Sequence, residues 1–284
     1  MHLGIEPIQY TPWDGKRTPI FNRIVLIADK VFKKNIKAKG VLALLIIGSI
    51  LVHVFPILTT AIIPFEKLTA EMMVKSAEMA MDVPYMMNPF FALFSILLAA
   101  VVTSDLISSD LQDNSFILYF SRPIKPAIYL TSKLLGSASV LAVYCLMMPL
   151  IFCLVVIATQ TGSDYLSSLK VMGMTFVAGL FITFFFSTMG LMMSSVTKRK
   201  AYAGVGTFMA FFAPMIISEF FAHFNENWKL LSPVNILHYT FLRIYGYSIP
   251  GSIEVNYYYA ALFGYLILPL LFTYYILQRR AMGK

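Results

Sequence analysis

Charged side chains are scarce in this sequence. Of its 284 residues, 13% are charged and 58% are hydrophobic, whereas soluble domains carry about 25% charged residues. The apolar residues gather in uninterrupted runs of about 20, the length with which a helix crosses the hydrocarbon layer of a membrane. This composition argues against an ordinary soluble fold. It predicts an all-α, polytopic membrane protein that forms a single transmembrane domain over residues 1–284.

Cysteine and histidine are also rare, and the sequence carries no catalytic signature. The two cysteines, Cys145 and Cys153, fall in one apolar run. On a helix they would be about 12 Å apart, which is too far for a disulfide. The sequence contains no GxxxxGK[ST] loop to cradle a phosphate and no HExxH or GxSxG motif. We therefore predict no catalytic, cofactor or metal site, and regard an intramembrane enzyme as disfavoured.

Two features leave alternatives open. His53 lies inside the first apolar run, where an ionisable residue is a candidate for function; it either lines a substrate pathway or hydrogen-bonds a neighbouring helix. A methionine-rich segment follows the same run, and its thioethers are either Cu(I) ligands or plain packing groups. Its methionines are Met72, Met73, Met79, Met81, Met86 and Met87.

Six apolar runs predict six transmembrane helices. They cover roughly 41–63, 87–107, 134–158, 171–196, 201–222 and 256–277. The fifth run contains Pro214, which a membrane helix tolerates because neighbouring groups satisfy the freed carbonyl. Residues 1–40 precede the first run as a polar, basic lead-in.

The distribution of Lys and Arg predicts the orientation. Residues 1–40, 105–133 and 197–201 and the C-terminal tail together hold 17 of the 22 basic residues, and the alternate segments hold five. Basic loops stay on the cytoplasmic side, so both termini are predicted to be cytoplasmic. The net charge of +8 is then a topology signal that also favours anionic lipid, and nucleic-acid binding is a poor interpretation of it.

Residues 18–37 predict an amphipathic helix before the first span. Ile20, Ile24, Ile27, Val31 and Phe32 recur at helical spacing, and basic residues fill the remainder. Such a helix lies along the inner leaflet or docks on protein, and both can hold.

The segment between the fifth and sixth runs, 223–255, is too apolar for a solvated loop. We expect two short helices hinged at Ser232-Pro233. Their apolar faces would lie in the outer leaflet, with Trp and Tyr at the headgroup level.

The stretch "DLQDNSFILYFSRPIKPAIYLTSKLL", residues 110–135, lies between the second and third runs. We expect a helix from Asp110 with carboxylates in its first turn, where they suit the helix dipole. An apolar patch would follow, and Arg122-Pro123 would stop the helix. A patch of this kind on a cytosolic helix needs the membrane surface or a partner protein to cover it.

This stretch resembles the hallmark of ABC-2 type transporter permeases. In that family an acidic residue is followed by a Gly-Thr-like pair, an apolar helix, an Arg-Pro pair and a Lys that starts the third span. Asp110, Asn114-Ser115, Arg122-Pro123 and Lys133 stand at these positions. The departures, Asp for Glu, Asn for Gly and Ser for Thr, are chemically mild. The order of an interface helix, six spans and a basic turn between spans 4 and 5 extends the resemblance over the chain.

The resemblance implies the permease subunit of an ABC exporter in the cell membrane. ATP and Mg would be bound by a separate ATP-binding cassette subunit, present in two copies beside two permease copies in a homodimer or heterodimer. The loop between spans 2 and 3 would be the coupling helix that docks on that subunit. Its residues are Asp110, Asp113, Phe116, Ile117, Phe120, Arg122 and Pro123.

The resemblance also implies a pathway between the two copies with an outer gate. Candidate lining residues are His53, Phe55, Phe211, Phe212 and Met215, and candidate gate residues are Trp228, Pro233 and Tyr239. The alternative function is an ATP-independent secondary carrier or channel. That class needs intramembrane charges for ion coupling, and His53 is nearly the only candidate.

Overall fold

A computed structural model describes residues 19–54, 90–115, 124–159, 165–249, 251 and 253–281. Every regular element within these ranges is helical and none is a strand, so the predicted all-α fold is confirmed. The elements are α1 (Ile20–Ile36), α2 (Lys39–Ser49), η1 (Ile50–Val54), α6 (Phe90–Ser104), α7 (Ser108–Gln112), α9 (Pro126–Ala142), η3 (Val143–Met147), α10 (Met148–Thr159), α11 (Tyr165–Val196), α12 (Lys200–Ala222), η4 (Glu226–Leu231), α13 (Pro233–Ile244) and α14 (Val255–Ala281).

Five helical stretches are long and apolar enough to cross a membrane. They are Phe90–Gln112, Pro126–Val155, Leu169–Val196, Lys200–Ala222 and Val255–Arg280. A sixth arises if α1 and the stretch Lys39–Val54, which meet at a bend of 74°, are counted together. We assign α2 and η1 to the first span and α1 to the predicted interface helix. The predicted outer end of the first span, 55–63, lies outside the described residues.

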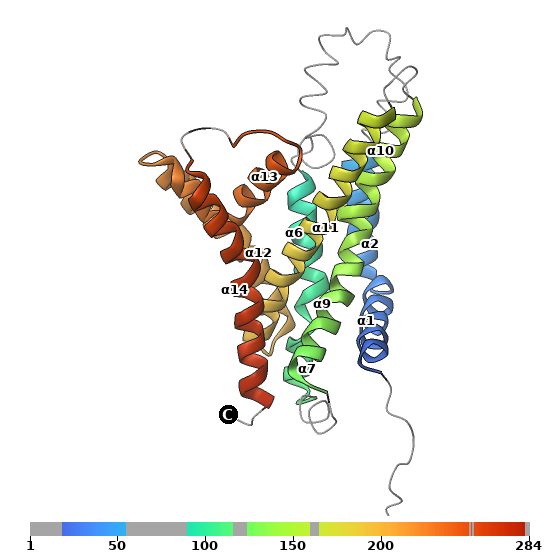
Figure 1. Cartoon of the computed structure of the whole chain (residues 1–284). Coiled ribbons are helices and arrows are strands. Elements are labelled where there is room, and N and C mark those ends of the chain that lie inside the picture. Colours follow the sequence, from blue (N-terminus) through green and yellow to red (C-terminus); the bar gives the residue numbers. More distant parts are fainter. Residues whose placement is uncertain are drawn as a thin grey trace, which may run out of the picture.

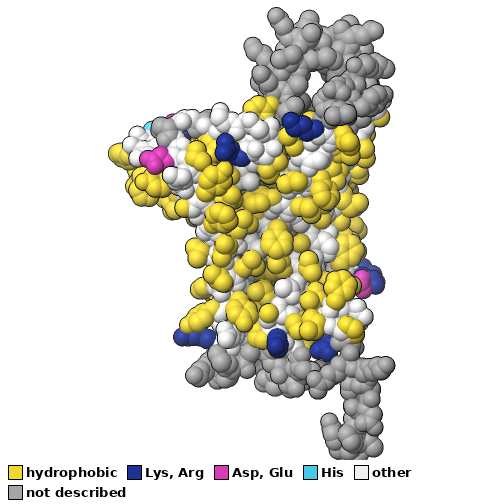
Figure 2. Space-filling view, viewed as in Figure 1, with side chains coloured by type: hydrophobic (Ala, Val, Ile, Leu, Met, Phe, Trp, Pro, Cys, Tyr) yellow, Lys and Arg dark blue, Asp and Glu magenta, His cyan; other side chains and the backbone are white. Residues whose placement is uncertain are grey.

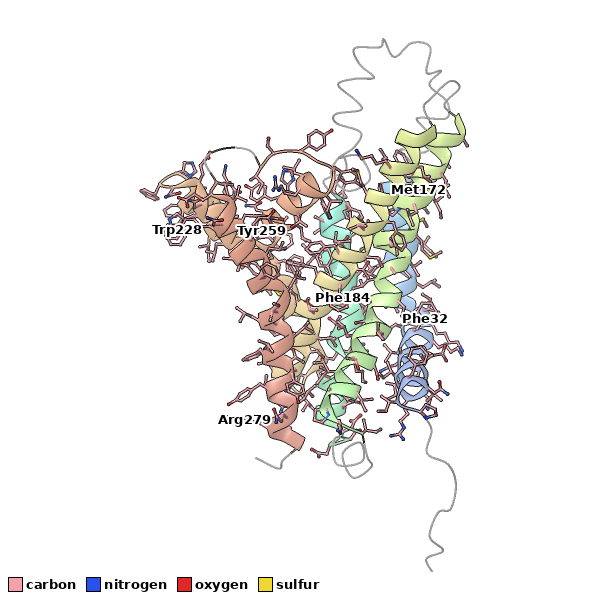
Figure 3. The ribbon with its side chains drawn as sticks, in the orientation of Figure 1. Phe32, Met172, Phe184, Trp228, Tyr259 and Arg279 are labelled. Atoms are coloured by element: carbon pink, nitrogen blue, oxygen red, sulfur yellow. The ribbon has the colours of Figure 1, made fainter. Side chains whose placement is uncertain are left out.

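The long helices run side by side (Figure 1). At one end lie α1, α7 and the C-terminal end of α14, and at the other lie the end of α10, the start of α11 and the hairpin of η4 and α13. A band of hydrophobic side chains covers the middle of the face shown in Figure 2, and Lys and Arg gather near its two ends. Figure 3 shows Arg279 at the first end and Trp228 at the second. This is the pattern of a multi-pass membrane protein.

Two central helices, α6 and α11, approach each other closely at Gly190. A Cβ atom at position 190 would overlap the side chain of Thr103 on α6, so no larger residue fits there unless Thr103 or its helix moves. Because lipid is as apolar as Leu, membrane helices associate through small residues that allow such close packing. The buried aromatic side chains of α11 and α12 extend this core, with the rings of Phe186 and Phe211 5.0 Å apart.

The interface helix α1 docks on protein through one face. Val31 is buried, and a Cβ atom at Gly136 of α9 would lie 2.6 Å from Val31 Cβ and 3.0 Å from the backbone oxygen of Ala28. Gly136 therefore allows the α1 backbone to lie directly against α9. The apolar side chains in the first turns of α1 are exposed, including Phe21 at 73%. The docked arrangement is thus present, and the exposed apolar side chains of the first turns remain available to lipid.

The segment after α12 folds into the two short helices that its sequence predicts. A 3-10 helix, η4, is followed by α13, and the hydroxyl of Ser232 caps α13 by accepting a hydrogen bond from the Asn235 N–H at 3.3 Å. The sequence predicts that the apolar faces of these helices lie in lipid, and for much of the hairpin this prediction is wrong. Ile236 and Phe241 are buried in the protein core, because α12 and α14 offer apolar surface on which α13 packs.

The orientation in the membrane remains a prediction, and cysteine labelling tests it. His223 near the hairpin and Asp113 after α7 are both exposed. In a background that lacks Cys145 and Cys153, a cysteine at position 223 should react with a membrane-impermeant maleimide added to intact cells. A cysteine at position 113 should react only after the cells are opened. Reversed labelling would overturn both the orientation and the cytoplasmic placement of the loop after α7.

Candidate functional site

The loop between spans 2 and 3 begins at a break in the helix. α6 ends at Ser104 and α7 begins at Ser108, so backbone groups of the intervening turn lose their helical partners. The hydroxyl of Ser194, on α11, accepts hydrogen bonds from the N–H groups of Ile107 and Ser108, both at 3.1 Å, and donates to the carbonyl of Ser104 at 3.2 Å. One side chain of the fourth span thereby satisfies the backbone groups that the break leaves unpaired, and it holds the turn against α11.

A buried ion pair joins α7 to the third span. Lys133 Nζ lies 2.8 Å from Asp110 Oδ2, and the two side chains are only 9% and 15% exposed. Tyr129, one turn earlier on α9 and fully buried, donates its hydroxyl hydrogen to the same carboxylate oxygen. The Lys133 ammonium also lies 5.3 Å from the centre of the Tyr129 ring. The start of the loop and the start of the third span are therefore held as one unit.

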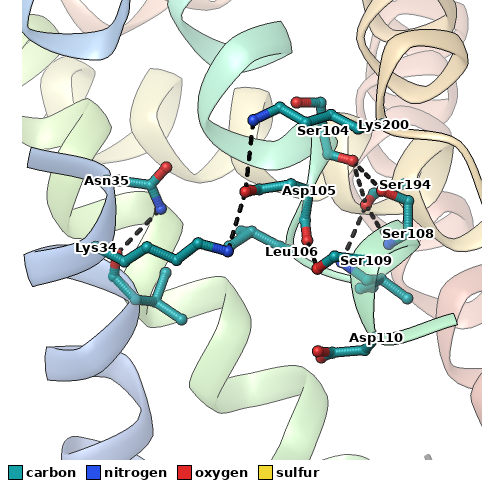
Figure 4. A network of polar contacts seen from close by, with 12 residues as sticks. Lys34, Asn35, Ser104, Asp105, Leu106, Ser108, Ser109, Asp110, Ser194 and Lys200 are labelled. Atoms are coloured by element: carbon teal, nitrogen blue, oxygen red, sulfur yellow. Dashed lines mark hydrogen bonds and ion pairs between the residues drawn. The ribbon is translucent and has the colours of Figure 1, made fainter. Parts of the chain in front are cut away.

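A second carboxylate, Asp105, connects the turn between α6 and α7 to α1 and to α12 (Figure 4). Its Oδ2 lies 3.0 Å from Lys34 Nζ on α1 and 3.5 Å from Lys200 Nζ at the start of α12. The Asp105 side chain is 14% exposed, whereas both lysines are more than half exposed. Exposed ion pairs contribute little to stability, but these two contacts link the interface helix, the end of span 2 and the start of span 5 through one carboxylate.

The predicted coupling helix starts and ends elsewhere than expected. The expected helix runs from Asp110 through the apolar patch. In the structure α7 begins at Ser108 and ends at Gln112, before the patch. Asp113 is the C-terminal cap, and Asn114 follows with φ of 53°. This left-handed conformation closes a helix, and the Ser115 N–H bonds to the Asp110 carbonyl at 2.9 Å. Asparagine tolerates it better than most residues, which explains Asn where the family pattern has Gly.

The remaining residues of the predicted loop lie outside the described part of the chain. They are Phe116, Ile117, Phe120, Arg122 and Pro123. The third span also begins earlier than expected, because α9 starts at Pro126, with proline in the first turn where its missing N–H costs nothing. Lys133 thus lies inside the helix, not at its start.

Sequence reasoning missed four partners of this site, namely Lys34, Asp105, Ser194 and Lys200. The one available signal was Asp105, a carboxylate directly at the end of an apolar run. Its partners lie 71 residues before and 95 residues after it, and no spacing rule links positions so far apart.

The predicted pathway residues are dispersed. His53 is buried in η1, and Phe55 lies outside the described residues. Phe211 is fully buried among core rings. Phe212 stacks on Phe208 with the ring centres 4.2 Å apart, and both Phe212 and Met215 are partly exposed. Phe211 therefore faces the core of its own chain, and Phe212 and Met215 are the candidates with a surface to offer.

The three predicted gate residues all lie in the hairpin of η4 and α13. Pro233 and Tyr239 are buried, and Trp228 is 48% exposed. Burial, with the nearby carboxylates of Glu219 and Glu226, raises the pKa of Tyr239, and burial lowers the pKa of His238. Both side chains are therefore neutral near pH 7. Within the described ranges no group of three His, Cys, Asp or Glu could hold a metal ion.

Comparison with models of protein families matches residues 25–282 to a family described as "ABC-2 family transporter protein". The match covers every described helix except the first residues of α1. The comparison with curated proteins gives no match.

Proposed function

Because the chain belongs to the ABC-2 family of transporter proteins, whose members are membrane subunits that work with an ATP-binding subunit, we propose that it is the permease of an exporter. In this proposal ATP and Mg are bound and ATP is hydrolysed on a separate chain. The permease lies in the cell membrane with both termini in the cytoplasm and carries no catalytic site of its own.

The observation that supports this proposal most is the ion pair between Asp110 and Lys133. A plain connecting loop needs no buried charge at its base, since burying a charged pair costs desolvation energy. A loop that must transmit force does need a rigid connection to the spans. Movement of the loop, driven by ATP binding on the partner, would pass through Asp110 and Lys133 directly into α9.

The contacts of Asp105 offer a second route by which movement of the loop could reach other helices. The short turn that links α6 to α7 carries this carboxylate, so a displaced loop would pull on Lys34 of α1 and Lys200 of α12. The interface helix and span 5 would then shift together with span 3. Breaking exposed ion pairs costs little, which suits contacts that must exchange in each transport cycle.

We further propose that the pathway forms between two permease copies. α12 carries a stripe of exposed apolar residues at helical spacing, including Val205, Met209, Ile216 and Phe220, and Phe212 and Met215 lie on the same helix. The hairpin with Trp228, Pro233 and Tyr239 would form a roof over the outer end that parts to release substrate.

Copurification tests the need for a separate ATP-binding subunit. The permease, tagged and expressed with the ATP-binding cassette subunit from the same genome, should retain that subunit through affinity purification in mild detergent. The complex should hydrolyse ATP and the permease alone should not, because the sequence has no phosphate-cradling loop. ATP hydrolysis by the purified permease alone, or a permease that retains no ATP-binding subunit, would contradict the proposal.

A further inference from the structure

Two spans carry a π-helical turn where they meet. η1 interrupts the first span at Ile50–Val54 and η3 interrupts the third at Val143–Met147. π-helical turns are rare and often mark functional sites. Each turn here presents a polar aromatic side chain to the other span, His53 from η1 and Tyr144 from η3, and their ring centres are 5.1 Å apart.

The Tyr144 ring is fixed by its neighbours. It stacks on Phe91 of α6 with ring centres 5.5 Å apart and planes 12° from parallel. A Cβ atom at Gly48 of α2 would lie 3.1 Å from Tyr144 Cε2, so the ring lies almost against the backbone of the first span. His53 closes the third side and contacts both rings edge-on. The tyrosine hydroxyl therefore cannot swing to a distant partner.

Both side chains are buried, and each carries a polar atom that is left unpaired within the described part of the chain. His53 and Tyr144 are 3% and 1% exposed, and neither His53 Nε2 nor the Tyr144 hydroxyl has a partner among the described residues. A buried polar group left unpaired is costly, and such groups normally bind protein or ordered water. Two of them side by side at two interrupted helices indicate one shared ligand.

We propose that His53 and Tyr144 form an internal binding site for a water molecule between spans 1 and 3. A small hydroxylic ligand suits this pair because the tyrosine hydroxyl and the imidazole each offer both donor and acceptor capacity. Water that inserts at an interrupted helical ladder is a recognised way to satisfy backbone groups in membrane helices. The water would thus join the two π-helical turns by hydrogen bonds, which the edge-on ring contact does not supply. This site stands independently of the proposed transport function.

The sign of a stability change tests the proposal. If the Tyr144 hydroxyl binds water, Tyr144→Phe should lower the Tm of the purified protein by about 2–4 °C. If the hydroxyl is merely unpaired, the same substitution removes a buried polar group and should leave the Tm unchanged or raise it, which would overturn the proposal. Tyr258→Phe calibrates the assay, because the Tyr258 hydroxyl is 3.0 Å from Thr240 Oγ1 and the residue is equally buried.

Two further measurements separate a shared water from other partners. If one ligand binds both residues, His53→Phe should cost little more in a Tyr144→Phe background, whereas independent sites would give additive losses and contradict the shared site. Hydroxyl-radical footprinting in ¹⁸O-labelled water should label Tyr144 well above Tyr258. Equal labelling of the two tyrosines would show that no water is bound at Tyr144 and would also overturn the proposal.

Discussion

Replacing Lys133 by methionine is expected to destabilise the protein by about 3–5 kcal/mol, because it leaves the Asp110 carboxylate buried without its cation. Methionine keeps most of the volume of the lysine stem, so the loss would come from the charge and not from a cavity. Thermal unfolding of the purified protein measures the effect directly.

Two matched variants make this result specific. Asp110→Leu combined with Lys133→Met removes both charges and should recover most of the lost stability, as apolar replacement of buried ion pairs often does. Lys34→Met breaks a contact of similar length, but the lysine is 58% exposed, so we expect a change of at most about 1 kcal/mol. Equal effects of Lys133→Met and Lys34→Met would show that the buried pair does not hold the loop to span 3.

The second large effect is expected at the apolar patch of the loop. Phe116→Asp and Phe120→Asp would place a charge at the centre of the proposed interface with the ATP-binding subunit. Truncating or charging such a central anchor costs about 2 kcal/mol or more, which weakens binding by at least about 30-fold. Retention of the ATP-binding subunit in affinity purification should fall accordingly, while the Tm of the permease alone stays unchanged.

Phe224→Asp is the matched control for these loop variants. Phe224 is 77% exposed and directly precedes the hairpin of η4 and α13, which lies at the opposite end of the molecule from α7. The same substitution there should leave copurification intact. If the Phe116 and Phe120 variants retained the ATP-binding subunit as well as Phe224→Asp does, the loop would not be the docking element.

Hydropathy predicts the spans of this protein well because lipid allows few alternatives. A backbone in hydrocarbon must satisfy its own hydrogen bonds, so a long apolar run is a helix. The helix ends were less predictable. α9 begins at Pro126, not near residue 134, because hydropathy detects the lipid-facing part of a helix and not the turns that extend beyond the membrane.

The site at the base of the loop was only half predictable. Asp110 and Lys133 stand out through the family pattern, yet their pairing depends on α7 folding back toward α9 across 23 residues. Local conformation decided the rest: α7 ends at Gln112, and Asn114 in the left-handed region closes it before the apolar patch begins. Similarly, periodicity predicts the amphipathic α1, but its docking on α9 depends on Gly136. The role of this glycine is visible only once α1 and α9 are seen packed together.

The most direct test of the account is a photo-crosslink from the loop. A benzophenone amino acid in place of Phe116, in membranes that contain the ATP-binding subunit, should give a covalent adduct with that subunit on illumination. The same probe in place of Phe224 should give none. If the probe at position 116 yields no adduct while the ATP-binding subunit remains bound to the permease, the loop does not transmit the action of ATP, and the proposed mechanism is contradicted.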